Sequence, residues 1–215
     1  MIIQGEIRRF TRNALSAVSR ALRMTAYESV AVASVEPSGF ELTRGGRRFI
    51  GGNQIIANGI APVAAIPTTT ATLALYNADP DKSLVIERLG FWLGSGTAAA
   101  GATLFATVSA GPIASPPTAH ATGYGTQNAN GGTQASRAFW SAAVTLPGSP
   151  AWFQVLSSFQ AAAANVGQGD IIANLEGLII VPPLRALGLA ILSGAGTSPL
   201  YGVSCVHVEI EADLE

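Results

Sequence analysis

The chain has 215 residues, a formal net charge of −1 and only 12% charged residues, against roughly a quarter in an ordinary soluble domain. This length can bury the core of one large all-β domain, and the near-zero net charge excludes a general nucleic-acid-binding role for the whole chain. A free monomer is normally kept in solution by a charged, mixed surface. The composition therefore predicts a chain that is covered by copies of itself or by a larger assembly.

The remaining bulk features exclude further classes. Cys205 is the only cysteine, so no intramolecular disulfide can form. No run approaches the ~18 uncharged apolar residues that a membrane span needs. Arg20 and Arg23 interrupt the apolar stretch that a secretory leader would require. We expect neither a membrane span nor such a leader.

Residues 5–24 carry apolar side chains at three- and four-residue steps, which predicts an amphipathic helix. Eight of the twelve Lys and Arg residues lie before residue 49, and five of them fall on the opposite face of this helix. We interpret residues 1–24 as a basic arm. Its arginines either face water or meet an acidic protein surface, anionic lipid or nucleic acid.

From residue 25 to 215 the pattern changes to short strands with Gly/Pro turns, which predicts a single β-sandwich domain, jelly-roll-like and mainly antiparallel. Residues 40–43 and 48–50 flank Arg44-Gly45-Gly46 and suggest a hairpin. The other glycine pairs, 51–52 and 131–132, are also interpreted as turns. The further strands are expected at 26–35, 53–67, 72–76, 83–93, 103–109, 151–157, 170–181, 186–192 and 201–212.

The segment 83–93 is the strongest strand pattern, and it is apolar at both odd and even positions. A strand of this kind is predicted to be buried on both faces. Residues 110–149 show no period and almost no charge beyond Arg137. A long irregular loop of this kind is typically functional or stretched over a partner.

Catalytic and metal-binding motifs are not recognisable in the chain. Cys205, His207, Glu209 and Glu211 alternate along one strand and share one face. Neighbours on that face are about 6.7 Å apart, too far for a Cys–His nucleophile pair, and no further metal ligand is signalled. We predict that Val206, Val208 and Ile210 point inward and that the polar residues face water. A hydrolase would need carboxylates or His207 to converge in a cleft.

Two weaker alternatives concern turns and loops. Asp79 and Asp81 lie in a turn where Asp commonly bonds its own backbone, with a calcium site as the alternative. His120 and Tyr124, with Trp140 and Trp152, would form a sugar-stacking surface if exposed. Tryptophans are more economically interpreted as core or interface anchors.

The stretch from Leu73 to Arg88, with Tyr76-Asn77 before a polar turn and Lys82-Ser83 after it, resembles a segment of tailed-bacteriophage virion proteins. The stretch from Ile180 to Leu187, with the strands that follow, is similar to the closing strands of such β-sandwich proteins. Leu184 stands where a glycine usually follows the proline pair. The resemblance implies a phage structural protein of the capsid-decoration or head–tail accessory type, and it transfers no catalytic or ligand residue.

We therefore expect a non-enzymatic virion protein without a cofactor, located in the virion, whose partners are copies of itself and a major capsid or other virion protein. A small-molecule substrate and nucleic acid are not expected as partners. The alternative is a glycan- or receptor-binding module of a tail or cell surface. The residues expected at the interface are Ile7, Arg8, Arg9, Phe10, Arg12, Val18, Arg20, Leu22, Arg23, Trp92, Glu209 and Glu211.

Overall fold

The computed structural model describes residues 3–7, 18–24, 30–31, 38–98, 101–120, 123–158, 171–194 and 196–212. The chain divides into two units, Met1–Glu41 and Leu42–Glu215, and each is described by itself. In the first unit, β1 (Ile3–Ile7), β2 (Val18–Met24) and β3 (Val30–Ala31) form a sheet in the order β1-β2-β3.

The helix predicted over residues 5–24 is wrong wherever the structure describes that segment. β1 and β2 pair antiparallel, with Ile3 opposite Leu22 and Ile7 opposite Val18. The four-residue spacing of Val18 and Leu22 puts both on one face of a strand as well as of a helix, and pairing with β1 selects the strand. Residues 8–17 lie outside the described residues, and so do the side chains of the whole predicted basic arm.

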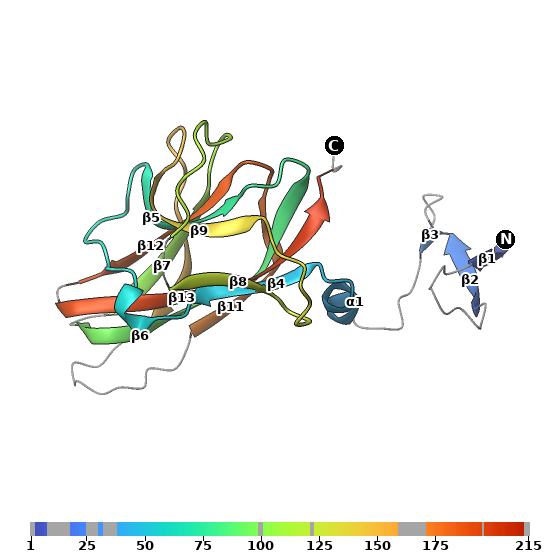
Figure 1. Cartoon of the computed structure of the whole chain (residues 1–215), viewed down its shortest axis with the longest axis horizontal. Helices are drawn as coiled ribbons and strands as arrows, with labels where there is room; N and C mark the ends of the chain where they lie inside the picture. Colours follow the sequence, from blue (N-terminus) through green and yellow to red (C-terminus); the bar gives the residue numbers. More distant parts are fainter. Residues whose placement is uncertain are drawn as a thin grey trace. The chain divides into compact units, whose positions relative to one another are not determined.

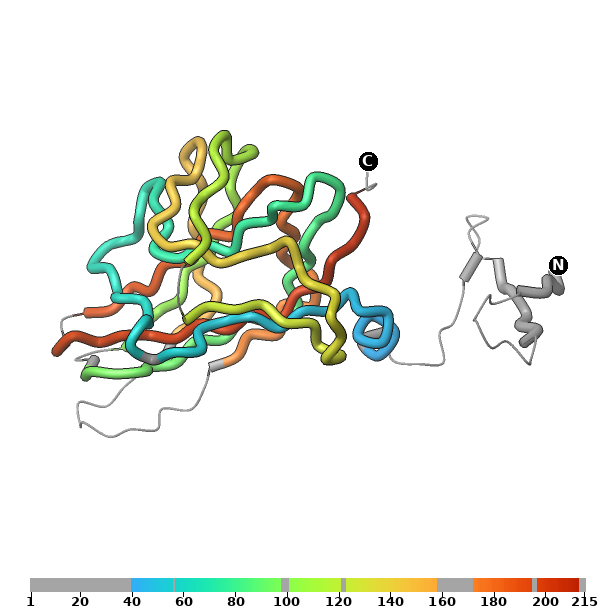
Figure 2. Tube along the Cα trace, viewed as in Figure 1, coloured from blue at the N-terminus to red at the C-terminus, as the bar shows by residue number. Residues whose placement is uncertain are grey.

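The second unit consists of two five-stranded sheets (Figures 1 and 2), with orders β10-β7-β12-β5-β9 and β11-β6-β13-β4-β8. All strand pairings within both sheets are antiparallel. The strands are β4 (Arg48–Asn53), β5 (Thr70–Asn77), β6 (Lys82–Ala98), β7 (Ala102–Val108), β8 (Tyr124–Asn128), β9 (Ala138–Thr145), β10 (Phe153–Ser158), β11 (Ile171–Val181), β12 (Ala186–Ser193) and β13 (Gly196–Glu211).

The connectivity is that of a jelly roll. Without β8 and β9, the sheets reduce to β4-β13-β6-β11 and β5-β12-β7-β10, eight strands in which first and last, second and seventh, and third and sixth are neighbours. Strands β8 and β9 are an excursion between β7 and β10 that adds one strand to an edge of each sheet. The predicted all-β, antiparallel sandwich is confirmed.

The core fills the space between the sheets with side chains from both inner faces. Leu73 and Leu75 come from β5, and Leu187 and Leu189 from β12. Burial of each such side chain contributes about 1.5–3 kcal/mol to folding. A second cluster, which includes Tyr76 and Leu146, lies beside β9.

Strand β6 was predicted to be buried on both faces, but only one face is buried. A β-bulge within the strand switches which alternate residues point into the core. Ile86 pairs with His207 and Arg88 with Val206, so Glu87 is an extra residue in the ladder. Before it, Leu84 and Ile86 are buried; after it, Leu89 and Phe91 are buried. One extra residue reverses the alternation of a strand, so even and odd positions reach the same core.

Two further local expectations are corrected. The hairpin proposed at residues 40–50 is instead a helix, α1 (Ser38–Arg44), followed by β4. The segment 110–149, expected to be irregular, contains β8 and β9. Its first part lies along β9, where His120 N–H donates to the Trp140 carbonyl at 2.7 Å and Ser141 Oγ donates to the Thr118 carbonyl at 2.7 Å. This segment covers a sheet edge that would otherwise be open.

The two segments that carried the phage resemblance meet in space. Asn77 is fully buried, and its side-chain amide donates to the carbonyls of Lys82, Val181 and Pro182. Leu184 has a φ of 58°, a conformation that favours glycine. The position where a glycine was expected therefore retains the backbone shape that glycine would adopt.

Candidate functional site

The outer face of the sheet β11-β6-β13-β4-β8 carries a row of very small residues across its strands. Gly125 pairs with Gly52, Gly52 with Ser204, and Ser204 with Gly90. Their chain neighbours Val203 and Cys205 are buried in the core, so this row faces outward. A Cβ at residue 52 would overlap the Val203 carbonyl oxygen, which shows how closely β4 and β13 approach.

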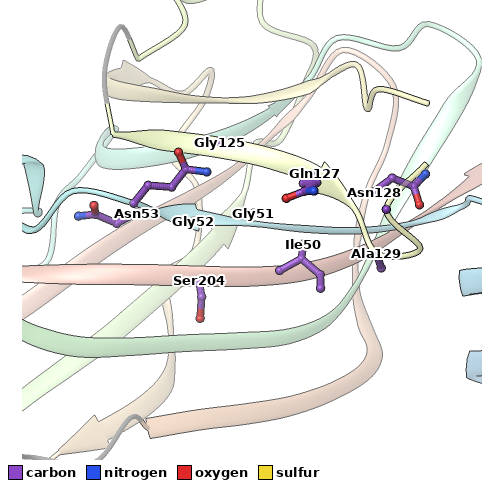
Figure 3. A pocket seen from close by; sticks show the side chains of 11 residues that line it. Ile50, Gly51, Gly52, Asn53, Gly125, Gln127, Asn128, Ala129 and Ser204 are labelled. Carbon is purple, nitrogen blue, oxygen red and sulfur yellow. The ribbon is translucent and has the colours of Figure 1, made fainter. Parts of the chain in front are cut away.

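A row of larger residues runs beside the small ones. Gln127 pairs with Ile50, Ile50 with Val206, and Val206 with Arg88. Ile50 is 51% exposed. Figure 3 shows the Ile50 and Ser204 side chains projecting to the same side of their strands. Small residues beside large ones leave a hollow in the sheet surface.

That hollow, which we call the trough, has a volume of about 530 Å³. Asn53 closes one end with an Asx turn in which its Oδ1 accepts from Ile55 N–H at 2.8 Å. Asn128 closes the other end, where its Oδ1 accepts from Asn130 N–H at 3.1 Å. The residues that line the trough are Ile50, Gly51, Gly52, Asn53, Gln54, Gly125, Gln127, Asn128, Ala129, Gly131 and Ser204 (Figure 3).

Edge strand β11 carries an apolar patch, formed by Ile172, Leu178 and Ile180, which are 50%, 85% and 42% exposed. The ladder with β6 runs from Asn174 opposite Arg88 directly to Ile179 opposite Ile86. The residues between bulge outward through Glu176 and Gly177, both with positive φ. Leu178 therefore projects from the edge strand, and we call these three residues the β11 patch.

The polar face predicted for β13 is inverted. Cys205, His207 and Glu209 are buried, with Cys205 in the main core. Of the three apolar residues expected inside, Val208 is buried, whereas Val206 and Ile210 are only half-buried. Glu209, the charged member of the set, gains interior partners in Ser136 and Lys82. Glu209, expected at an interface, is instead held inside its own domain, and Glu211 remains exposed.

The hydrogen bonds around His207 do not form a catalytic triad. Ser136 Oγ donates to Glu209 Oε1 at 2.6 Å and lies 3.4 Å from His207 Nε2. In a triad the serine proton goes to the imidazole and the carboxylate orients the other ring nitrogen. Here the carboxylate takes the serine proton, and Nδ1 of His207 has no partner among the described residues.

Burial controls the titration of these groups. It lowers the pKa of His207 to about 4, so the imidazole is neutral near pH 7, and its ring stacks on Phe49 at a centroid distance of 5.5 Å. Burial also raises the pKa of the Cys205 thiol far above its ordinary value. Lys82 Nζ lies 3.6 Å from Glu209 Oε2. These properties describe a structural polar cluster inside the sandwich.

The two weaker site hypotheses also receive structural answers. Asp79 Oδ1 accepts from Asp81 N–H at 2.9 Å, and its other oxygen lies 3.9 Å from Arg137 Nε, as expected for a turn. No group of three or more His, Cys, Asp or Glu in the described part of the chain could hold a metal ion.

The sugar-stacking surface considered as an alternative would lack one of its four aromatic residues, Trp140. Trp140 is 3% exposed, and Tyr124 packs between it and His120, with centroid distances of 5.8 and 4.7 Å. Burial raises the pKa of Tyr124 to about 12. Trp140 is thus a core residue, as the more economical interpretation held.

Sequence reasoning missed the trough and the β11 patch. A glycine within a strand signals the close approach of another backbone or a ligand, but Gly51-Gly52 was interpreted as a turn. Of the predicted interface residues, Trp92 lies on the outer face of the same sheet, half-buried over Gly202. The first nine residues of that prediction, from Ile7 to Arg23, have side chains outside the described residues.

The chain matches no protein-family model, no curated protein and no solved structure. None of the helices in the described part of the chain has the length and apolar character needed to cross a bilayer.

Proposed function

We propose that this chain is a non-enzymatic structural subunit of a phage virion, of the capsid-decoration or head–tail accessory type, that acts by assembling with copies of itself and with another virion protein. The observation that carries the proposal is the β11 patch. An edge strand whose exposed side chains are large and apolar is a ready site for association with another chain.

The charge distribution supports the same function. On the outer face that bears the patch, Arg48 is neutralised by Glu87 at 2.7 Å, whereas Arg88 and Glu176 stay exposed. Interface centres are depleted in charged residues. A whole-chain content of 12% charged residues is in keeping with a surface that is partly covered in use.

The fold adds support by analogy only. Jelly rolls are common in viral capsid proteins and also in lectins, and one fold serves many functions. Within the sandwich, the most elaborate polar cluster engages Ser136 and Glu209 with each other rather than with an open cleft. This arrangement favours a structural role over catalysis.

Sedimentation velocity of the full chain tests self-assembly. We expect concentration-dependent association of the unchanged chain and a monomer for Leu178→Glu, because a charge placed in the centre of an apolar contact is costly to desolvate. Ile66→Glu is the matched control, since Ile66 is 47% exposed and lies in a loop outside the patch. Equal association of the two variants contradicts the proposal.

The virion assignment has a separate test. Antibodies against the chain should label particles purified from the organism that encodes it, and the label should survive salt washes that remove adsorbed protein. Labelling confined to membranes or to the soluble fraction contradicts it. Deleting residues 1–24 further tests whether the basic segment contributes to assembly; its side chains lie outside the described residues.

A further inference from the structure

The trough is a hollow that is lined by uncharged residues. Among the described residues that line it there is no Asp, Glu, Lys or Arg. Its volume of about 530 Å³ lies within the usual ~300–1,000 Å³ range of small-ligand sites. Because the residues that line the trough include no Lys or Arg, anionic ligands such as phosphates and acidic peptides would find no ionic partner in it.

Three side chains offer unused hydrogen-bonding capacity to the trough. Gln54, Gln127 and Ser204 line it, and none of their side chains hydrogen-bonds within the described part of the chain. Each presents both a donor and an acceptor. A ligand rich in hydroxyl groups, which are likewise both donor and acceptor, is the best match for such a set.

The apolar component comes from Ile50 and from the glycine floor. Ile50 is half exposed beside Ser204, and Gly52 and Gly125 leave the backbone without side chains between them. A Cβ at residue 125 would strike the end of the Gln54 side chain. The glycines thus keep a flat, partly apolar floor and let Gln54 lie across it.

We propose that the trough binds a neutral saccharide chain. A sugar ring has an apolar C–H face, which would contact Ile50 and the glycine floor, and equatorial hydroxyls, which would bond Gln127 and Ser204. This inference goes beyond the assembly role, because the trough lies over β4, β8 and β13, whereas the apolar patch lies on β11.

Titration of the isotope-labelled full chain with maltohexaose, cellohexaose and chitohexaose, followed by backbone amide shifts, tests the proposal. We expect at least one of these neutral hexasaccharides to shift the amides of residues 50–54 and 125–128 saturably. Gln127→Ala should weaken that binding about fivefold, as expected for the loss of one hydrogen bond. Ser204→Leu, which fills the floor, should abolish it.

Gln154→Ala is the matched control, because Gln154 is exposed on β10 of the other sheet; its affinity should equal that of the unchanged chain. Absence of saturable shifts with all three hexasaccharides at about 5 mM, a concentration that would detect a millimolar Kd, overturns the proposal. So does binding that Gln127→Ala and Ser204→Leu leave unchanged.

Two other outcomes point to other ligands and also overturn it. A heparin hexasaccharide that binds more tightly than every neutral one would indicate a charge-driven site. An extended uncharged peptide that shifts only the amides of edge strand β8 would indicate strand addition. Leu178→Glu, which tests assembly, should leave the saccharide affinity unchanged, so the two proposals fail separately.

Discussion

The indole of Trp92 occupies the space above Gly202 in which any other residue would place its Cβ. The two residues are direct partners on β6 and β13. Gly202→Ala should therefore displace the ring and lower the free energy of unfolding by about 1–3 kcal/mol, the usual cost of overpacking. Gly111→Ala is the control, because nothing lies within 4 Å of its Cβ position.

A double-mutant cycle by urea denaturation isolates this contact. If the ring causes the loss, Gly202→Ala should cost much less in a Trp92→Ala background. An equal cost in both backgrounds would show that the alanine disturbs the strand in some other way.

From the bulge in β6 we predict that deleting Glu87 destabilises the fold far more than substituting it does. Glu87→Gln removes only the ion pair with Arg48, which at partial exposure contributes about 0–1 kcal/mol. Deletion restores regular alternation and places Leu84 and Ile86 on the outer face while Leu89 and Phe91 stay inside. Circular dichroism should show a folded Gln variant and an unfolded deletion; a folded deletion variant argues against the bulge.

His207 predicts a loss of stability in mild acid. Its folded-state pKa of about 4 lies below the ordinary value of 6.5 because the ring is buried. As the pH falls, the unfolded chain takes up the proton first. The contribution of the neutral imidazole to the free energy of unfolding is therefore fully present above pH ~6.5. It is lost progressively towards pH ~4, by about 3 kcal/mol in total.

Urea denaturation at several pH values compares the unchanged chain with His207→Gln, which cannot titrate. The difference between their slopes against pH isolates the imidazole from Glu209, Lys82 and the other groups nearby. Parallel curves for the two proteins would mean that His207 is protonated as readily in the folded state as in the unfolded one.

At position 184 we predict that glycine gives a more stable protein than alanine. Its positive φ costs an L-residue about 1–2 kcal/mol. Leu184→Gly should therefore be more stable than Leu184→Ala by roughly 1 kcal/mol, although glycine is the more flexible residue when unfolded. Thermal denaturation of both variants measures this directly. Alanine equal to or better than glycine would contradict the left-handed conformation.

Ser136 is predicted to matter for stability and not for chemistry. Its hydroxyl contacts Glu209, His207 and the backbone N–H of Ala138. Ser136→Ala should cost about 1–3 kcal/mol, because Glu209 loses a buried partner. Ser204→Ala, at a half-exposed serine, should cost much less. Covalent labelling of Ser136 by a fluorophosphonate would contradict the structural role.

The sequence was sufficient where alternation and turn chemistry agreed. Strands β5 and β12 were predicted within two residues of their bounds, and the Asn77–Lys82 turn was recognised. The helix predicted over residues 5–24 failed because Val18 and Leu22, four residues apart, share a face in a strand as well as in a helix, and only a partner strand decides between them. Local patterns carry no information about such partners.

The candidate sites depended still more on distant contacts. The bulge at Glu87 is defined by the register with β13. The inward orientation of the Glu209 side chain depends on Ser136, a residue 73 positions earlier. The trough arises because Gly125, Gly52 and Ser204, far apart in sequence, fall into one row. Residue types alone could not reveal that alignment.

Strands β12 and β13 are the last two of the sandwich, and each lies in the middle of a sheet, β12 between β7 and β5 and β13 between β6 and β4. A nascent chain that ends before residue 186 therefore has its outer strands but no centre in either layer. Neither sheet can close until both β12 and β13 have been synthesised and have left the ribosome. Pairings this distant in sequence form slowly, and the apolar strands made first need protection from aggregation during that delay.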